Sequence, residues 1–190
     1  MNAILASIVI LTNLAYTAAF DTETRCPLWN YYVLEPGEIV VTNRADNPFR
    51  ADPRVPESDL AKDYEKSGYD RGHMAPAADF NFDQEALKET YLFTNIAPQM
   101  PVINRGEWAV VEREVRALAA SGSVHVLTYP LFTHEFPPRY IGRIRVPDCY
   151  VKMAFGYFGL RQWMVSNHYD IEPSRACYSE ENTQTKEGTK

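Results

Sequence analysis

Residues 70–80 read DRGHMAPAADF, a stretch that predicts a short strand leading into an irregular turn. Successive side chains of an extended chain point to opposite faces, so Arg71 and His73 project side by side. An arginine can neutralise a phosphate, and a histidine can accept a proton from water near neutral pH. Gly72 between them permits close approach of a ligand or of another backbone segment. The pair therefore suits phosphate chemistry, and it equally fits a surface contact or a structural histidine.

Downstream of this stretch, residues 104–120 predict one long helix, which Ser121-Gly122 would end. Four apolar residues fall on one face of that helix: Trp108, Val111, Val115 and Leu118. Runs rich in β-branched and aromatic residues predict strands at 30–41 (with a hairpin-like break at Pro36-Gly37), 91–97, 123–132, 139–146 and 149–158. The sum is an α+β fold, a mostly antiparallel sheet with a long helix packed against it.

The predicted helix offers two oxygen donors beside its apolar stripe. Asn104 begins the helix, and Glu112 follows about 80° around the helix axis. Mg²⁺ prefers oxygen ligands, keeps several waters and often takes only one or two protein donors. The two side chains are therefore a candidate Mg²⁺ site. The alternative is that Asn104 caps the helix and that Glu112 pairs with a neighbouring arginine.

Three motifs occur in a fixed order along the chain. They are DRGH followed by Ala-Pro, the strand end TNIAPQ at 94–99, and a helix that begins with Asn and carries Trp and Glu four and eight residues later. This set, which spans roughly residues 30–165, resembles the DNA/RNA non-specific endonuclease family of the ββα-metal group. The resemblance implies a ββα-metal catalytic motif, a nuclease activity and a divalent metal cofactor.

The resemblance also implies roles for individual residues. His73 corresponds to the general base that activates the attacking water. Asn104 corresponds to the one direct protein ligand of Mg²⁺, which Mn²⁺ could replace, and Glu112 to the carboxylate that holds the metal through water. Asn95 corresponds to a strand asparagine beside the histidine, and Arg71 to a phosphate-contacting arginine.

A second arginine in such sites lies upstream and stabilises the transition state. Arg44, which precedes Phe49-Arg50-Ala51-Asp52, is the choice here, with Arg50 and Arg54 as alternatives. The expected reaction is hydrolysis of DNA and RNA with little base preference, because phosphate contacts carry no sequence information. The expected products carry 5′-phosphates.

Residues 1–20 contain no charged side chain, and small residues follow an apolar run over 4–14. This pattern predicts a secretory signal cleaved near Ala19–Asp21, a secreted or periplasmic protein and a single domain over 21–190. The run is short for a membrane span, so no stable membrane association is expected. A buried N-terminal strand or helix and an uncleaved anchor are the alternatives. The polar tail from about residue 179 is expected to be loose.

Three cysteines leave one thiol over if a disulfide forms. Cys149 and Cys177 are the favoured pair, because their bond would tie the polar C-terminal segment to a core strand. The cysteine and histidine spacing matches no zinc site.

The 190 residues carry a formal net charge of −6, with 45% apolar residues, which is ordinary for a globular protein and excludes a disordered chain. An acidic chain needs a local basic patch to bind nucleic acid. Arg139, Arg143 and Arg145 alternate along one predicted strand and form either such a track or a solvated face. The competing functions are an inactive nuclease-like binding protein, a phosphodiesterase for small or lipid phosphates, and a hydrolase that does not act on phosphate.

Overall fold

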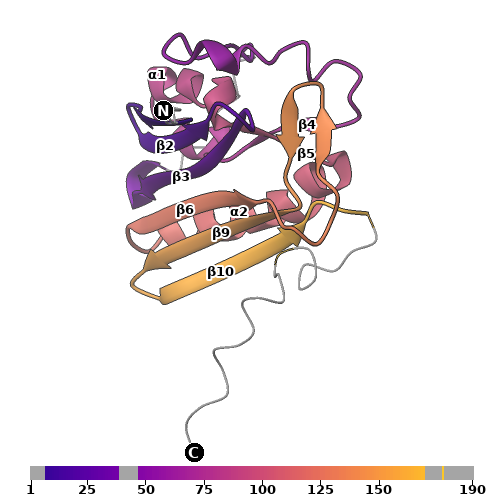
Figure 1. Ribbon diagram of the computed structural model, residues 1–190. Coiled ribbons are helices and arrows are strands. Elements are labelled where there is room, and N and C mark those ends of the chain that lie inside the picture. The colour runs from indigo at the N-terminus through magenta and orange to yellow at the C-terminus, as the bar shows by residue number, and fades with distance from the viewer. Residues whose placement is uncertain (1–6, 39–46, 170–176, 178–190) are drawn as a thin grey trace, which may run out of the picture.

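The computed structural model describes residues 7–38, 47–169 and Cys177. Among these residues, six antiparallel strands form the main sheet in the order β1-β2-β3-β6-β9-β10 (Figure 1). They are β1 (Ile8–Thr12), β2 (Tyr16–Asp21), β3 (Cys26–Leu34), β6 (Val124–Leu131), β9 (Cys149–Gly156) and β10 (Gly159–Ser166). The predicted α+β class and the mostly antiparallel sheet are confirmed.

One face of this sheet is covered by helix α2 (Trp108–Ala119) (Figure 1). Trp108, Val111 and Val115 are buried there, as their helical spacing predicts. Trp108 and Val111 pack with Tyr150 of β9, so the apolar stripe joins the helix to the sheet. The chain enters α2 through a wider, π-helical turn over Ile103–Glu107.

Smaller elements surround the sheet and α2. Two short antiparallel pairs are β4 (Asp70–His73) with β5 (Ile96–Gln99), and β7 (Arg139–Ile141) with β8 (Ile144–Val146). Helix α1 spans Gln84–Glu89, and Asp83 caps it by accepting from two backbone N–H groups. Short 3₁₀ turns lie at Pro36–Glu38, Pro56–Ser58, Ala77–Phe80 and Phe93–Asn95.

The N-terminal prediction needs correction. Residues 8–21, expected to belong to a cleaved signal, instead build β1 and β2 of the main sheet. Ala18, Ala19 and Phe20 are fully buried. Cleavage near Ala19–Asp21 would remove two sheet strands and expose this core, so the domain boundary expected at residue 20 falls inside the sheet. Of the alternatives, the buried N-terminal strand matches the structure.

Other expectations also change at the element boundaries. The predicted hairpin break at Pro36-Gly37 is a 3₁₀ turn, and β3 pairs with β2 and β6. The strand predicted over 91–97 is shorter and later, Ile96–Gln99, after a 3₁₀ turn. Residues 39–46 and the polar tail from 179 lie outside the described residues. Within the described part of the chain, no helix is long and apolar enough to cross a membrane.

The cysteine prediction is confirmed. Cys149 and Cys177 form a disulfide, with their Cα atoms 5.4 Å apart. Cys26 is a free, buried thiol. Burial raises the pKa of Cys26 beyond the range of physiological pH, which leaves this thiol protonated.

Candidate active site

A cleft of about 410 Å³ opens between β4 and the start of α2. Four residues predicted from the sequence line it together: Arg71, His73, Asn104 and Glu112. The rest of its lining is Phe49, Pro76, Ala77, Tyr91, Arg105 and Ala109. A larger depression around Arg143, about 600 Å³, contains none of the predicted site residues. The cleft is therefore the candidate site.

The β4–β5 pair sets the direction of the motif side chains. Arg71 lies opposite Pro98 and His73 opposite Ile96, which puts both side chains on one face, as the strand period predicts. Gly72 lies on the other face, where a Cβ atom would overlap the buried side chain of Gln99. A glycine is therefore required for β4 and β5 to pack this closely.

Aromatic rings fix the imidazole of His73. The ring centroid of Phe49 lies 5.4 Å from that of His73, and Tyr91 meets the imidazole edge-to-face at 5.1 Å. Phe49 is held in place because its neighbour Arg50 pairs through its backbone with Tyr91 and Phe93. Packing on two sides limits rotation of the imidazole and keeps it in the cleft wall.

Arg71 presents a positive charge to the cleft. Its guanidinium carbon lies 5.5 Å from the ring centroid of Phe49 and 5.4 Å from that of Tyr64, in cation–π geometry. Its Nε atom is buried and has no hydrogen-bond partner in the protein. Among the described residues, no carboxylate forms an ion pair with it. An anion in the cleft would meet a guanidinium that is not already neutralised.

Asp70, which the sequence analysis did not single out, orients Asn104. The side-chain Nδ2 of Asn104 donates to Asp70 at 2.9 Å, so the amide oxygen of Asn104 is directed away from Asp70. Arg105 donates to both oxygens of the same carboxylate, at 2.8 and 2.7 Å. Burial raises the pKa of Asp70, but the hydrogen bonds from Arg105 and Asn104 outweigh burial and lower it below its usual value. The carboxylate therefore stays ionised at neutral pH. No signal in the sequence indicated this role, because the strand period puts Asp70 on the face away from Arg71 and His73 and its partner Asn104 lies 34 residues along the chain.

The turn that carries Asn104 is anchored from behind. The N–H of Asn104 donates to the carbonyl of Met100 at 2.9 Å. The N–H of Met100 donates to the side chain of Asn167, which is fully buried, at 3.0 Å. The amide nitrogen of Asn167 in turn donates to the carbonyls of Pro98 and Pro147. The end of β10 thereby fixes the start of the helix.

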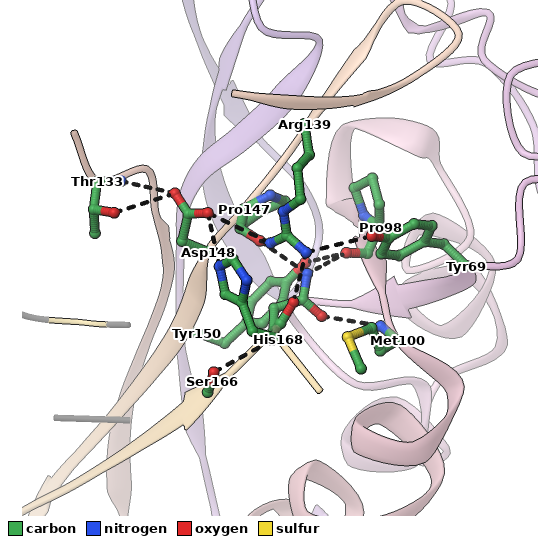
Figure 2. A network of polar contacts seen from close by, with 11 residues as sticks. Tyr69, Pro98, Met100, Thr133, Arg139, Pro147, Asp148, Tyr150, Ser166 and His168 are labelled. Carbon is green, nitrogen blue, oxygen red and sulfur yellow. Dashed lines mark hydrogen bonds and ion pairs between the residues drawn. The ribbon is translucent and has the colours of Figure 1, made fainter. Parts of the chain in front are cut away.

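Figure 2 shows the polar network around this anchor. Arg139 donates to the carbonyls of Asn167 and Pro147, at 2.9 and 2.8 Å, and lies 3.4 Å from Asp148. His168 meets the same carboxylate at 3.0 Å. Burial and the charge of Arg139 lower the pKa of His168, despite Asp148. The guanidinium of Arg139 is therefore used in contacts within the protein and is not part of a basic track for nucleic acid.

The other two arginines of the predicted track are also engaged. Arg143 forms a two-pronged ion pair with Asp63, and Arg145 lies over the ring of Phe132. The predicted single strand over 139–146 is in fact the β7–β8 hairpin, so the three side chains do not follow one strand. The basic track is therefore not formed.

Asn95 lies behind the site instead of lining it. It is fully buried and makes four side-chain hydrogen bonds, accepting from Asn30 and the Ala75 N–H and donating to the carbonyls of Ala75 and Thr90. Its backbone carbonyl also accepts the N–H of Met74. Every polar atom of the Asn95 side chain is used to hold the segment after His73, and a role of Asn95 in catalysis stays a prediction.

The second arginine is not supplied by the described alternatives. Arg44 lies outside the described residues. Arg50 donates to the carbonyl of Lys88, and Arg54 is held by Asp52 and Asn13. Neither lines the cleft.

The cleft also fits a hydrated divalent cation. Asn104 and Glu112 line it together and offer oxygen atoms, the donors that Mg²⁺ prefers. The contact with Asp70 turns the amide oxygen of Asn104 away from the carboxylate. Within the described ranges, no cluster of three or more His, Cys, Asp or Glu side chains could bind a metal. This donor set suits an ion that keeps most of its waters.

Comparison with known proteins agrees with this geometry. Nuclease 1, mitochondrial, of Schizosaccharomyces pombe is 40% identical over 126 residues, covering 63% of this chain and 39% of the relative. Human endonuclease G, mitochondrial, is 37% identical over 122 residues, covering 62% and 41%. The chain thus spans about two fifths of the length of these relatives. A crystal structure of the EndoG/EndoGI complex matches with a TM-score of 0.79 and 26% identity, covering 87% of this chain and 78% of that one.

The expected secreted or periplasmic location is wrong. The relatives from S. pombe, Saccharomyces cerevisiae and human carry names that place them in mitochondria. The segment expected to direct export forms β1 and β2 instead.

The profile of the DNA/RNA non-specific endonuclease family matches residues 4–183, nearly the whole chain. That match begins ahead of β1 and includes both N-terminal strands, the β4–β5 pair and α2. Sequence motifs, fold and cleft therefore agree, and the chain belongs to the DNA/RNA non-specific endonuclease family.

Proposed function

We propose that this chain is a metal-dependent endonuclease that hydrolyses phosphodiester bonds of both DNA and RNA. The observation that carries the proposal is the convergence of Arg71, His73, Asn104 and Glu112 on one cleft from separate segments of the chain. An imidazole, an unneutralised guanidinium and two oxygen donors are the groups that this hydrolysis needs.

In the proposed reaction, His73 accepts a proton from the attacking water. Its imidazole is suited to this role because Phe49 and Tyr91 hold it in one orientation. Arg71 contacts the non-bridging phosphate oxygens and offsets the charge that grows on them. Arg44 is the proposed second arginine for the same charge.

Asn104 would hold Mg²⁺, or Mn²⁺ in its place, through its amide oxygen, and Glu112 would hold it through water. When bound, the ion supplies positive charge that stabilises the leaving 3′ oxygen. Asp70 accepts from the amide nitrogen of Asn104, which leaves the amide oxygen to bind the ion. Release of the 3′ oxygen leaves a 5′-phosphate on the product.

Substrate choice follows from the same contacts. Groups that bind phosphate position a nucleic acid without reading its sequence, so base preference should be weak. The net charge of −6 opposes a polyanion, so attraction rests on the local charge of the cleft and should weaken with salt.

The test is a digestion of supercoiled plasmid and of total RNA by the purified chain, with Mg²⁺ and with EDTA. We expect both substrates to be cut only with Mg²⁺, and end-labelling to find 5′-phosphates. Two outcomes oppose the proposal. Cleavage that persists in EDTA would exclude the metal-dependent reaction. Intact polymers, from a folded protein that cleaves a small phosphodiester, would favour a small-substrate phosphodiesterase.

A further inference from the structure

Lys152 of β9 is a buried cation that the proposed reaction leaves unexplained. Its side chain is fully buried on the face of the sheet that α2 covers. Among the described residues, no carboxylate lies within ion-pair distance of its ammonium group. Burial lowers its pKa, although Glu112 and Asp79 raise it in part. A buried charge without a direct counter-ion normally opposes folding.

The contacts of Lys152 lead to the cleft from two sides. Its Nζ donates to the hydroxyl of Thr128 at 2.7 Å and to the carbonyl of Met74 at 3.3 Å. Met74 directly follows His73. The same Nζ lies 5.0 Å from the ring centroid of Trp108, which stands one helical turn before Glu112.

The surrounding charges do not form a direct ion pair with this ammonium group. Arg116 donates to Asp79 at 2.7 Å, and the hydroxyl of Tyr32 donates to the other oxygen of Asp79 at 2.6 Å. The ring of Tyr32 lies 6.0 Å from Nζ of Lys152. Glu112 lines the cleft and acts on Lys152 as a nearby charge without forming a direct ion pair with it. The ammonium is thus held by a hydroxyl, a carbonyl and aromatic faces.

Methionine has nearly the same shape as the lysine stem and carries no charge. Replacing a buried charge by an apolar side chain of similar volume is often neutral or stabilising. The fold itself therefore gives little reason for a lysine at this position. The two groups that it links, the end of β4 and the first turn of α2, are the two walls of the cleft.

We propose that Lys152 is a positioning residue for the nuclease reaction. Its amino group contacts both the Met74 carbonyl, next to His73, and the Trp108 ring, one helical turn before Glu112. Through these two contacts it would fix the position of His73 relative to Glu112. This inference rests on the proposed function. It assigns Lys152 no contact with substrate or metal.

The test compares the Lys152→Met and Lys152→Gln variants with the parent chain on plasmid DNA at saturating Mg²⁺. We expect Lys152→Met to fold with an unfolding temperature close to that of the parent, because removal of the buried charge offsets the lost bonds to Thr128 and Met74. We also expect its kcat to fall at least tenfold while KM stays within twofold. Lys152→Gln keeps an N–H donor at the end of a side chain one bond shorter, and should recover part of the lost kcat.

Val126→Ala is the matched control, because Val126 is fully buried in the main core and does not line the cleft. It should lower the unfolding temperature and keep the kcat of the parent. A Lys152→Met kcat within twofold of the parent, or one that falls only with its folded fraction, would overturn the inference. If Lys152→Met does not fold, Lys152→Leu decides, because it also lacks a donor: a folded Lys152→Leu chain with parental kcat overturns the inference. An inactive parent would instead contradict the proposed function.

Discussion

The contact between Asp70 and Asn104 allows a sharp test of the metal site. Asp70→Asn preserves the shape of the side chain but removes the charge. The Asn104 amide then loses a charge-assisted acceptor at 2.9 Å, a difference of about 1 kcal/mol for one partly buried bond. The Arg105 contact adds little to stability, because the Arg105 side chain is 73% exposed. Groups that orient a metal ligand typically affect metal affinity by about 10–100-fold.

The weakened bond alone corresponds to about fivefold, and groups that orient a metal ligand reach about 10–100-fold, so we expect Asp70→Asn to bind Mn²⁺ at least about fivefold more weakly in calorimetric titration. The Mg²⁺ concentration for half-maximal cleavage should rise by a similar factor. Arg105→Gln is the control, because it removes the ion pair and leaves the Asp70–Asn104 bond intact. The reasoning is refuted if Asp70→Asn binds Mn²⁺ within twofold of the parent, or if Arg105→Gln weakens Mn²⁺ binding as much as Asp70→Asn does.

Three further predictions follow from buried contacts. Asn95→Ala leaves the backbone N–H and carbonyl of Ala75, just after His73, without their hydrogen-bond partners. The free energy of unfolding in urea should fall by about 3 kcal/mol and kcat should fall, with Mn²⁺ affinity unchanged. Burial raises the pKa of Asp52, but bonds from Arg54 lower it below 3.8, so Asp52 stabilises the fold above that pH and the gain is lost as pH falls. Thermal melts of Asp52→Asn should therefore depend less on pH below about pH 4 than those of the parent. Cys177→Ser opens the bond to Cys149 across 28 residues and should cost about 3–4 kcal/mol in urea unfolding, with an effect that reducing agent reproduces in the parent.

The motif residues were predictable because period and spacing express their geometry directly. A strand period of two places Arg71 beside His73, and a helical period places Trp108, Val111 and Val115 on the buried face. The structure confirms both patterns. The π-helical turn before Trp108 was not predictable, because its wider winding depends on tertiary contacts and changes no residue pattern.

The N-terminus could not be assigned from sequence, because an uncharged apolar run fits both an export signal and a buried strand. β2 is buried along nearly its whole length, so it lacks the alternation that marks a half-exposed strand. β10 was missed for the opposite reason. Its first four residues, Gly159–Gln162, are exposed, so the apolar signal there is weak.

The predicted strand over 91–97 stops before Pro98, because proline cannot donate to a strand ladder, yet Pro98 lies inside β5. β5 belongs to a two-stranded pair, where a residue without an N–H group is tolerated on the unpaired side. The buried polar contacts of Lys152, Asn167 and Asn95 were also beyond prediction. Their partners come from distant segments, and a sequence gives no distance between them.

The most direct test of the central claim is the His73→Ala variant, assayed on plasmid DNA and on RNA at saturating Mg²⁺. General-base catalysis typically contributes about 10²–10⁴-fold. We expect kcat to fall by that factor on both substrates, while Mn²⁺ affinity and unfolding temperature stay close to the parent. A folded His73→Ala chain that cuts either polymer at the parental rate would contradict the assignment of this cleft as the active site.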